Sequence, residues 1–435
     1  MPDLNQTQIT IGEGPRLARL RRRRLEDIAA HLAAPPAGIR FCLIRPIQSG
    51  PQGEIPSDVD LLVAPQDVSR LKQRVIDYCR ALKLPVLIHQ RDNRIGVTIT
   101  RKGETALILD FATKQQVRDR TAKRFDMFGF DDIAEYVRAD MGAVPELSPD
   151  IGLLLYLLHV SAKPYKLKRS PERVLARIVD LAARAGPESK AINEQAKALI
   201  SPVFQPDALN QLALPLLRER VNLRPYHKPS PKPKRNLVAS VVGPDGSGKT
   251  AISNHILGWF SNSFDRKKVK TLYRKSPIYL TFRAVFQGLW QDSNTMDEAI
   301  SLPCFLLALR GFHRRRSNAK KGFIFDRYFY DMLLKGIRSH NRPRRAFWWH
   351  WAARRVPPSD LVIVLDVPWE VAHSRKPELQ ASAWPVIYQN YFDVSDINGT
   401  PLLAVCYTDA SFENTTTFVM QTVSKALELH ELGQL

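Results

Sequence analysis

Apolar residues in the second half of the chain gather in short unbroken runs, and longer segments with helical spacing separate these runs. The runs lie near residues 237–242, 322–326, 361–366 and 402–406. Short continuous apolar runs are typical of strands buried on both faces, and their alternation with helices is what a parallel sheet requires. The pattern predicts an α/β fold for this half.

The first half has a different pattern, in which short strands come first and helices follow. Strands are expected at 41–46, 59–63, 94–100 and 106–111, a helix between them at 68–82, and further helices at 151–160, 171–185 and 189–200. This order predicts an α+β sheet domain followed by a helical subdomain.

A stretch that alternates prolines with cations, residues 225–235, separates the two halves. Proline fixes φ and removes a backbone donor, so this stretch should be an extended, exposed linker. A chain of 435 residues is expected to form several domains. The expected boundaries are 1–35 for an N-terminal basic helix, 36–150 for the sheet domain, 151–222 for the helical subdomain, 223–236 for the linker and 237–435 for the C-terminal domain.

The composition, 44% hydrophobic and 25% charged, is that of a folded soluble protein. The four cysteines form no C-x-x-C pair and no metal-binding spacing, which indicates buried or free thiols in a reducing compartment: Cys42, Cys79, Cys304 and Cys406. The apolar runs are too short to cross a bilayer, and the N-terminus lacks a signal-peptide core. We therefore expect a cytoplasmic protein.

The formal net charge of +21 calls for a nucleic acid, a membrane surface or a phosphate-rich substrate as partner. Residues 21–24 are four arginines on a predicted helix, for which a solvated face is favoured over a nucleic-acid contact. Segment 338–355 interleaves arginines with tryptophans and is open between base stacking, a membrane surface and a buried helix with a charged outer face. The basic residues 314–316 and 320–321 are interpreted as an exposed face.

Residues 243–250 read G-P-D-G-S-G-K-T, a complete G-x-x-x-x-G-K-[ST] loop directly after a predicted strand. A strand that leads through this loop into a helix aims backbone N–H groups and the helix dipole at one point, where phosphates fit. The expected nucleotide-binding residues are Gly243, Asp245, Gly246, Ser247, Gly248, Lys249 and Thr250. Lys249 should reach the β- and γ-phosphates, and the Thr250 hydroxyl should bind Mg²⁺. The loop predicts binding of ATP or GTP.

Three further motifs follow the loop in order: G-F-I-F-D-R-Y at 322–328, L-V-I-V-L-D-V-P at 361–368 and T-D-A-S at 408–411. Together with the loop, they resemble the thymidylate kinase group of P-loop nucleoside monophosphate kinases over about residues 236–430. This resemblance implies a phosphotransferase that uses ATP and Mg²⁺. It also implies that Arg375 and Lys376 belong to a mobile lid, that Arg310 and His313 bind the acceptor, and that residues 409–411 lie near the adenine.

Phosphoryl transfer depends on positioning and on neutralising charge around the moving group. Asp326 is expected at the carboxyl end of a strand beside the loop, where an acid can hold Mg²⁺ or orient the acceptor. Arg327 would face the transferred or accepting phosphate, although the two residues could instead form a buried ion pair. The predicted catalytic residues are Lys249, Asp326, Arg327 and Arg375. Asp366 is open between loop geometry and chemistry.

The acceptor is left open, because residues 329–335 lack the small residues and the glutamine by which thymidylate kinases recognise thymine. A phosphorylated or otherwise anionic acceptor suits the charge. A kinase acting on a sugar or glycan intermediate is one alternative, and a nucleic-acid-binding ATPase or regulator is another. A homodimer is possible.

In the first half, P-S-D-V-D-L-L-V at 56–63 places Asp58 and Asp60 on one face of a strand, because strand side chains alternate. Asp110 ends a later strand and could complete a cluster that binds Mg²⁺ ions. Residues 36–220 resemble the nucleotidyltransferase superfamily, which implies either a second transfer site or a substrate-recognition module. The combination of both halves resembles fused proteins associated with bacterial cell-surface polysaccharide synthesis.

Overall fold

The computed structural model describes residues 15–34, 38–44, 58–91, 93–101, 104–138, 144–165, 171–200, 204–226, 235–267, 307, 311–312, 316, 321–326, 351, 354–355, 358–377, 381, 384–408 and 412–435. The chain forms two compact units. Unit 1 comprises Met1–Tyr78, Asn93–Thr98 and Ala106–Pro229, and unit 2 comprises Cys79–Asp92, Ile99–Thr105 and Ser230–Leu435. The sequence placed Cys79–Asp92 in the expected sheet domain 36–150, whereas the structure groups these residues with the C-terminal half.

Unit 2 is built on a sheet of strand order β12-β13-β11-β14-β15-β3. Its elements are β3 (Val86–Arg91), β11 (Val238–Val242), α8 (Lys249–Trp259), β12 (Phe264–Lys267), β13 (Gly322–Asp326), β14 (Leu361–Asp366), α14 (Trp369–Arg375), α15 (Trp384–Ile397), β15 (Leu402–Tyr407) and α16 (Phe412–Glu431). Among themselves, the strands β11 to β15 are parallel to their neighbours, which confirms the α/β pattern of the second half.

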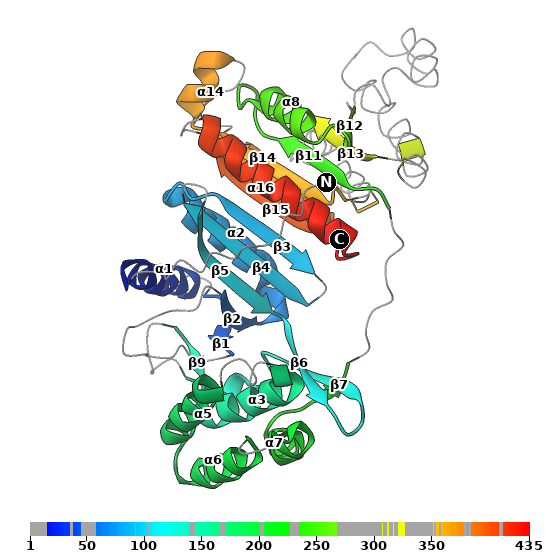
Figure 1. The fold of residues 1–435 in the computed structure, drawn as a ribbon. Helices are drawn as coiled ribbons and strands as arrows, with labels where there is room; N and C mark the ends of the chain where they lie inside the picture. Colours follow the sequence, from blue (N-terminus) through cyan, green and yellow to red (C-terminus); the bar gives the residue numbers. More distant parts are fainter. Residues whose placement is uncertain are drawn as a thin grey trace. The chain divides into compact units, whose positions relative to one another are not determined.

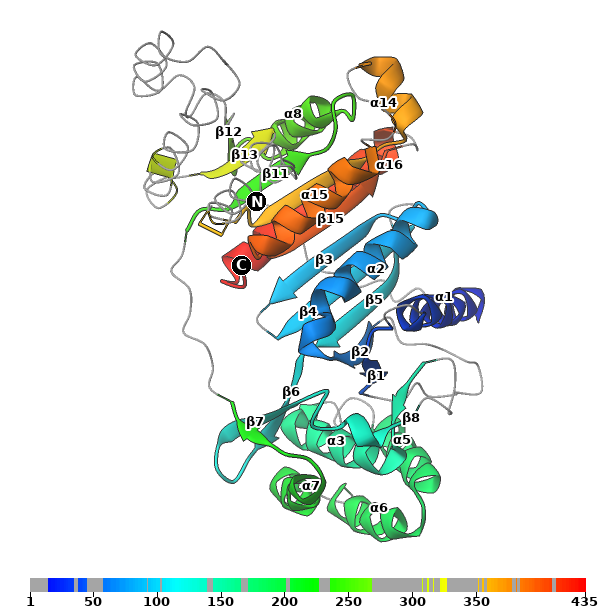
Figure 2. The ribbon, with the colours of Figure 1, turned by 180° about the vertical axis from the view of Figure 1, so that it is seen from behind.

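Helices cover both faces of this sheet, because its apolar strands present buried side chains on each side. Figure 1 shows α8 and α16 over one face, and the reverse view in Figure 2 shows α15 over the other. Val241, Ile363 and Ala404 pack into one hydrophobic cluster with Ile256 of α8 and Val423 of α16.

β3 lies antiparallel to β15, with Leu402 opposite His89 and Val405 opposite Val86. The sequence pattern did not predict this strand. Its pairing satisfies the backbone donors and acceptors along β15, which would otherwise be an edge.

His89 makes the stability of unit 2 depend on pH. Burial, with help from Arg91 and Lys425, lowers the pKa of His89 to about 4, whereas an unfolded histidine has a pKa of about 6.5. Below pH 6.5 the unfolded state therefore takes up a proton that the folded state does not, and stability falls until the pH reaches about 4.

The free energy of unfolding should fall between pH 7 and pH 4.5 in the unaltered chain. In His89→Gln we expect this fall to be smaller by about 1–3 kcal/mol. Urea unfolding at the two pH values would measure this loss in both proteins. Equal losses in the unaltered chain and the variant would contradict the assignment.

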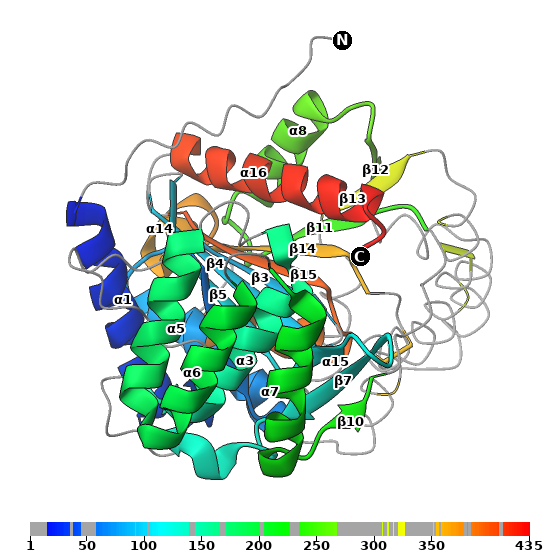
Figure 3. The same ribbon diagram turned by 60° about the horizontal axis from the view of Figure 1, so that its bottom comes forward.

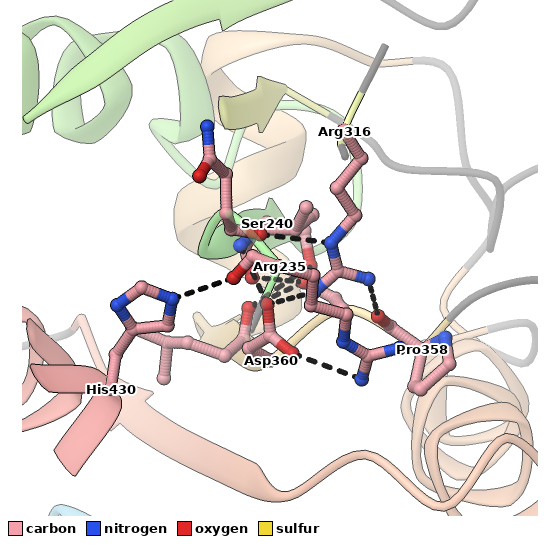
Figure 4. Close-up of polar contacts among 10 residues, drawn as sticks. Arg235, Ser240, Arg316, Pro358, Asp360 and His430 are labelled. Atoms are coloured by element: carbon pink, nitrogen blue, oxygen red, sulfur yellow. Dashed lines mark hydrogen bonds and ion pairs between the residues drawn. The ribbon is translucent and has the colours of Figure 1, made fainter. Parts of the chain in front are cut away.

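A buried cluster of polar groups ties the starts of β11 and β14 together (Figure 4). The Asp360 carboxylate, 2% exposed, accepts from the backbone N of Val238 at 2.8 Å and pairs with Arg316 and Arg235. Arg316 also donates from Nε to the Asn236 carbonyl oxygen at 2.8 Å. The prediction of an exposed basic face at 314–316 is wrong for Arg316, which is 1% exposed, because a buried carboxylate at a strand start compensates its charge.

Unit 1 contains a mixed sheet in which β2 runs parallel to β5 and antiparallel to β1. The elements that lie wholly or partly in it are α1 (Pro15–Ala33), β1 (Phe41–Leu43), β2 (Asp58–Val63), η1 (Pro65–Asp67), α2 (Val68–Ala81), β4 (Arg94–Arg101), β5 (Glu104–Ala112), β6 (Lys114–Asp119), β7 (Arg124–Gly129), η2 (Ala134–Tyr136), β8 (Val137–Arg138), β9 (Glu146–Leu147), α3 (Pro149–Ala162), α5 (Pro171–Ala185), α6 (Pro187–Ile200), α7 (Pro206–Arg220) and β10 (Arg224–Pro225). Each strand and helix expected in this half has a counterpart, although β1 ends at Leu43, whereas β6 to β10 and α7 were not predicted.

The helices α3, α5, α6 and α7 pack side by side, as Figure 3 shows. Their apolar faces share a core that includes Leu154, Ile178, Ala196 and Leu217. Arg218 of α7 binds the buried carboxylates of the β6–β7 hairpin, at 2.7 Å from Asp119 and 2.6 Å from Asp126. This pair of contacts fixes the hairpin to the helices.

Three of the four cysteines, Cys42, Cys79 and Cys406, are buried free thiols, and Cys304 lies outside the described residues. Burial raises the pKa of Cys42 and of Cys406 to about 12, so both stay protonated at neutral pH. Within the described ranges, no helix has both the length and the apolar character that spanning a membrane requires.

Candidate active site

The loop at 243–248 follows β11, a strand flanked in parallel register by β13 and β14, and leads into α8. Gly243 and Gly246 have φ values of +151° and +86°. A Cβ atom on Gly243 would lie 2.8 Å from the Leu365 carbonyl oxygen, and one on Gly246 would lie 2.5 Å from that of Ala372. The neighbouring elements therefore exclude any side chain at these two positions.

Lys249 is the first residue of α8 and is 5% exposed. Its ammonium group donates to the carbonyl oxygens of Gly243 and Pro244, at 2.7 and 2.5 Å. Asp245 Oδ1 lies 3.5 Å from the same nitrogen. The loop carbonyl oxygens thus hold the ammonium group against the loop backbone, and the phosphate-binding role of Lys249 stays a prediction.

Two further cations approach the loop from the end of α14. Arg375 Nη1 donates to the Gly246 carbonyl oxygen at 3.3 Å, and Lys376 Nζ lies 3.6 Å from Asp245 Oδ2. Both side chains are exposed. The structure therefore brings together the loop and the two cations that the sequence predicted as parts of a lid.

Thr250 and Asp326 meet at the carboxyl ends of two adjacent parallel strands. The register pairs Asp326 of β13 with Val241 of β11, and the Thr250 hydroxyl donates to Asp326 Oδ2 at 3.0 Å. A hydroxyl and a carboxylate are the oxygen donors that Mg²⁺ prefers. The structure therefore places the two residues predicted as metal ligands in this half side by side, and their role as ligands stays a prediction.

Ser247 adds a further polar group to the loop. Its side chain is 3% exposed, and its Oγ has no hydrogen-bond partner among the residues that the structure describes. Burying a hydroxyl in this way costs free energy unless a partner is supplied. The polar loop, its ammonium group and this hydroxyl all fit a bound polyphosphate.

Helix α15 contributes aromatic hydroxyls that the sequence analysis missed. The Tyr391 hydroxyl donates to the Gly243 carbonyl oxygen at 3.1 Å, and the Tyr388 hydroxyl donates to the Leu365 carbonyl oxygen at 3.1 Å. Trp384 Nε1 donates to the Val367 carbonyl oxygen at 2.9 Å. Trp384, Tyr388 and Tyr391 share one helical face, and this spacing was the signal that could have revealed them.

Asp366, which the sequence left open between loop geometry and chemistry, ends β14. Its Oδ2 accepts from Arg80 Nε at 2.7 Å. Its backbone carbonyl oxygen accepts from the Thr408 N–H at 2.8 Å. These contacts bind Asp366 to protein partners at the strand end.

Several predicted residues lie outside the described part of the chain. They are the acceptor-binding Arg310 and His313, the catalytic Arg327, residues 409–411 near the expected adenine, and most of the segment 338–355. Their roles stay predictions.

In unit 1 the parallel register places Asp60 opposite Asp110. The Asp110 carboxylate is 2.7 Å from Arg94 Nη1, and the Asp58 side chain is outside the described residues. Within the described ranges, no group of three His, Cys, Asp or Glu side chains could hold a metal ion. The predicted carboxylate cluster of Asp58, Asp60 and Asp110 stays a prediction, and Arg94 would compete with a cation for Asp110.

A parallel sheet whose central strand leads through a glycine-rich loop into a helix N-terminus is the arrangement of a P-loop phosphate-binding site. Neither a protein-family model nor a curated protein matches the sequence. Among solved structures, the chain is similar to a thymidylate kinase from Candida albicans, with 15% identity and a TM-score of 0.35 over 45% of this chain and 94% of that one. It is also similar to a deoxyadenosine kinase from M. mycoides, with 17% identity and a TM-score of 0.31 over 43% of this chain and 98% of that one.

Proposed function

We propose that the chain is an ATP- and Mg²⁺-dependent phosphotransferase, a nucleotide kinase-like enzyme whose nucleotide site is the loop at 243–250. The observation that carries this proposal is the Thr250–Asp326 contact of 3.0 Å beside the buried Lys249 ammonium group. Together these groups offer oxygen ligands and a positive charge at one helix N-terminus. This arrangement suits a nucleoside triphosphate bound with its metal ion.

Each residue of the site has a role that follows from its position. The backbone N–H groups of the loop would bind the β- and γ-phosphates, and Lys249 would turn from the Gly243 and Pro244 carbonyl oxygens toward them. Thr250 and Asp326 would hold Mg²⁺, which supplies neutralisation of phosphate charge when bound. Arg375 and Lys376 would approach the transferred group from α14 and exclude water.

The phosphotransferase proposal is tested by ATP consumption in the presence of Mg²⁺ with a panel of nucleoside monophosphates, sugars and oligonucleotides. We expect one acceptor class to stimulate ADP formation by the full chain. In Lys249→Ala this stimulated rate should fall by about 10²–10³-fold, because a charge that stabilises the transferred phosphoryl group is lost.

Lys425→Ala provides the matched control, since Lys425 is an exposed lysine of α16 that pairs with Glu428. It should retain the rate of the unaltered chain. Tight ATP binding without acceptor-stimulated turnover would contradict the proposal and favour a regulatory or nucleic-acid-binding role.

A further inference from the structure

Arg80 belongs to unit 2 although it precedes the phosphate-binding loop by more than 160 residues. Its Nε donates to Asp366 Oδ2 at 2.7 Å, and its guanidinium carbon lies 5.1 Å from the ring centre of Tyr388 and 5.7 Å from that of Phe392. Burial lowers the pKa of Arg80, but the Asp366 carboxylate, helped by smaller contributions from Tyr407 and Tyr388, raises it overall. The residue therefore remains a cation that contacts both β14 and the aromatic face of α15.

Tyr388 connects this cation to the end of β14. Its hydroxyl accepts from the Val367 N–H at 2.9 Å and donates to the Leu365 carbonyl oxygen at 3.1 Å. The side chain is 1% exposed, and burial together with the Asp366 charge raises its pKa well above the ordinary value. Tyr388 thus stays a neutral donor whose orientation depends on the groups packed around it.

One turn further along α15, Tyr391 reaches the phosphate-binding loop. Its hydroxyl donates to the Gly243 carbonyl oxygen, the same atom that accepts from Lys249 Nζ. Gly243 also packs closely against Leu365, the carbonyl acceptor of Tyr388. The start of the loop is therefore held by α15 and by β14, the two elements that Arg80 contacts.

We propose that Arg80 is a positioning residue for the phosphate-binding loop. It holds Asp366 and the aromatic face of α15 together, and this keeps Tyr391 on the Gly243 carbonyl oxygen. The consequence for nucleotide affinity rests on the proposed function. The consequence for the loop backbone does not.

The first test uses hydrogen–deuterium exchange of the full chain without nucleotide. Peptides that cover residues 243–250 should exchange about tenfold faster in Arg80→Ala and in Tyr391→Phe than in the unaltered chain. Arg91→Ala is the matched control, because Arg91 is an exposed arginine of the same segment, and its loop should exchange at the unaltered rate. Unchanged exchange of the loop in Arg80→Ala would overturn the proposal.

The second test measures ATP binding by calorimetry in the presence of Mg²⁺. Arg80→Ala should raise the Kd by about tenfold, Arg80→Lys should recover part of the loss, and Arg80→Ala combined with Tyr391→Phe should be no weaker than either single variant. Fully additive losses would overturn the proposal, since they would show that the two residues act separately. Absence of ATP binding by the unaltered chain would overturn the proposed function, and the exchange experiment would still decide the role of Arg80.

Discussion

Replacing Asp360 by asparagine is expected to lower the free energy of unfolding of unit 2 by about 3–5 kcal/mol. The carboxylate is 2% exposed and faces Arg316, which is 1% exposed. Asparagine could still accept the N–H of Val238, but the Arg316 guanidinium would remain buried without an anion. An uncompensated buried charge is among the most destabilising changes that a single substitution makes.

Chemical denaturation monitored by tryptophan fluorescence measures this difference. Asp265→Asn is the matched control, because Asp265 is an exposed aspartate of β12, and its change should stay within about 0.5 kcal/mol. Arg316→Leu combined with Asp360→Leu should be less harmful than Asp360→Asn alone, since it removes both charges. A double variant less stable than the single one would contradict this account of the cluster.

The second large effect is expected at the proposed metal site. Asp326→Asn should weaken the Mg²⁺-dependent part of ATP binding and turnover by at least the 10–100-fold that loss of a supporting ligand typically costs. The amide carries no charge to balance the cation, whereas the carboxylate does. Thr250→Val should have an effect of similar size, because it removes the α8 hydroxyl that contacts Asp326.

Thr250→Ser keeps the hydroxyl and is therefore the conservative control, with activity expected close to that of the unaltered chain. The measurement is a titration of ATP consumption with Mg²⁺ at fixed ATP. If Asp326→Asn had the Mg²⁺ dependence of the unaltered chain, Asp326 would not be a metal ligand, and the phosphotransferase proposal would lose its main support.

The sequence predicted four strands of unit 2, β11, β13, β14 and β15, because each is a buried, continuous apolar run, whereas β3 and β12 are not. The loop at 243–250 was also predicted, because the motif specifies the local backbone geometry that its glycines adopt. Arg316 was misread because nothing local distinguishes a buried arginine from a solvated one. Its partner, Asp360, is 44 residues away.

Arg80 was missed for the same reason on a larger scale, because 286 residues separate it from Asp366. β3 is short and polar at its end, with His89, Gln90 and Arg91, so its sequence has no strong strand period. Its partner strand β15 was predicted correctly, but the pairing of the two depends on the tertiary fold. Long-range pairs of this kind are what a single sequence does not specify by pattern.

The position of β3 bears on how such a chain could have been assembled and recombined. Recombination at the proline-rich linker would transfer the C-terminal half of the chain to another protein. Residues 79–92, which belong to the same unit as that half, would not be transferred with it. The donated half would arrive with the backbone of β15 unpaired from Leu402 to Val405, and an open strand of this kind invites association with other chains. Inheritance of the two halves as one gene therefore protects a sheet whose strands are encoded on both sides of the linker.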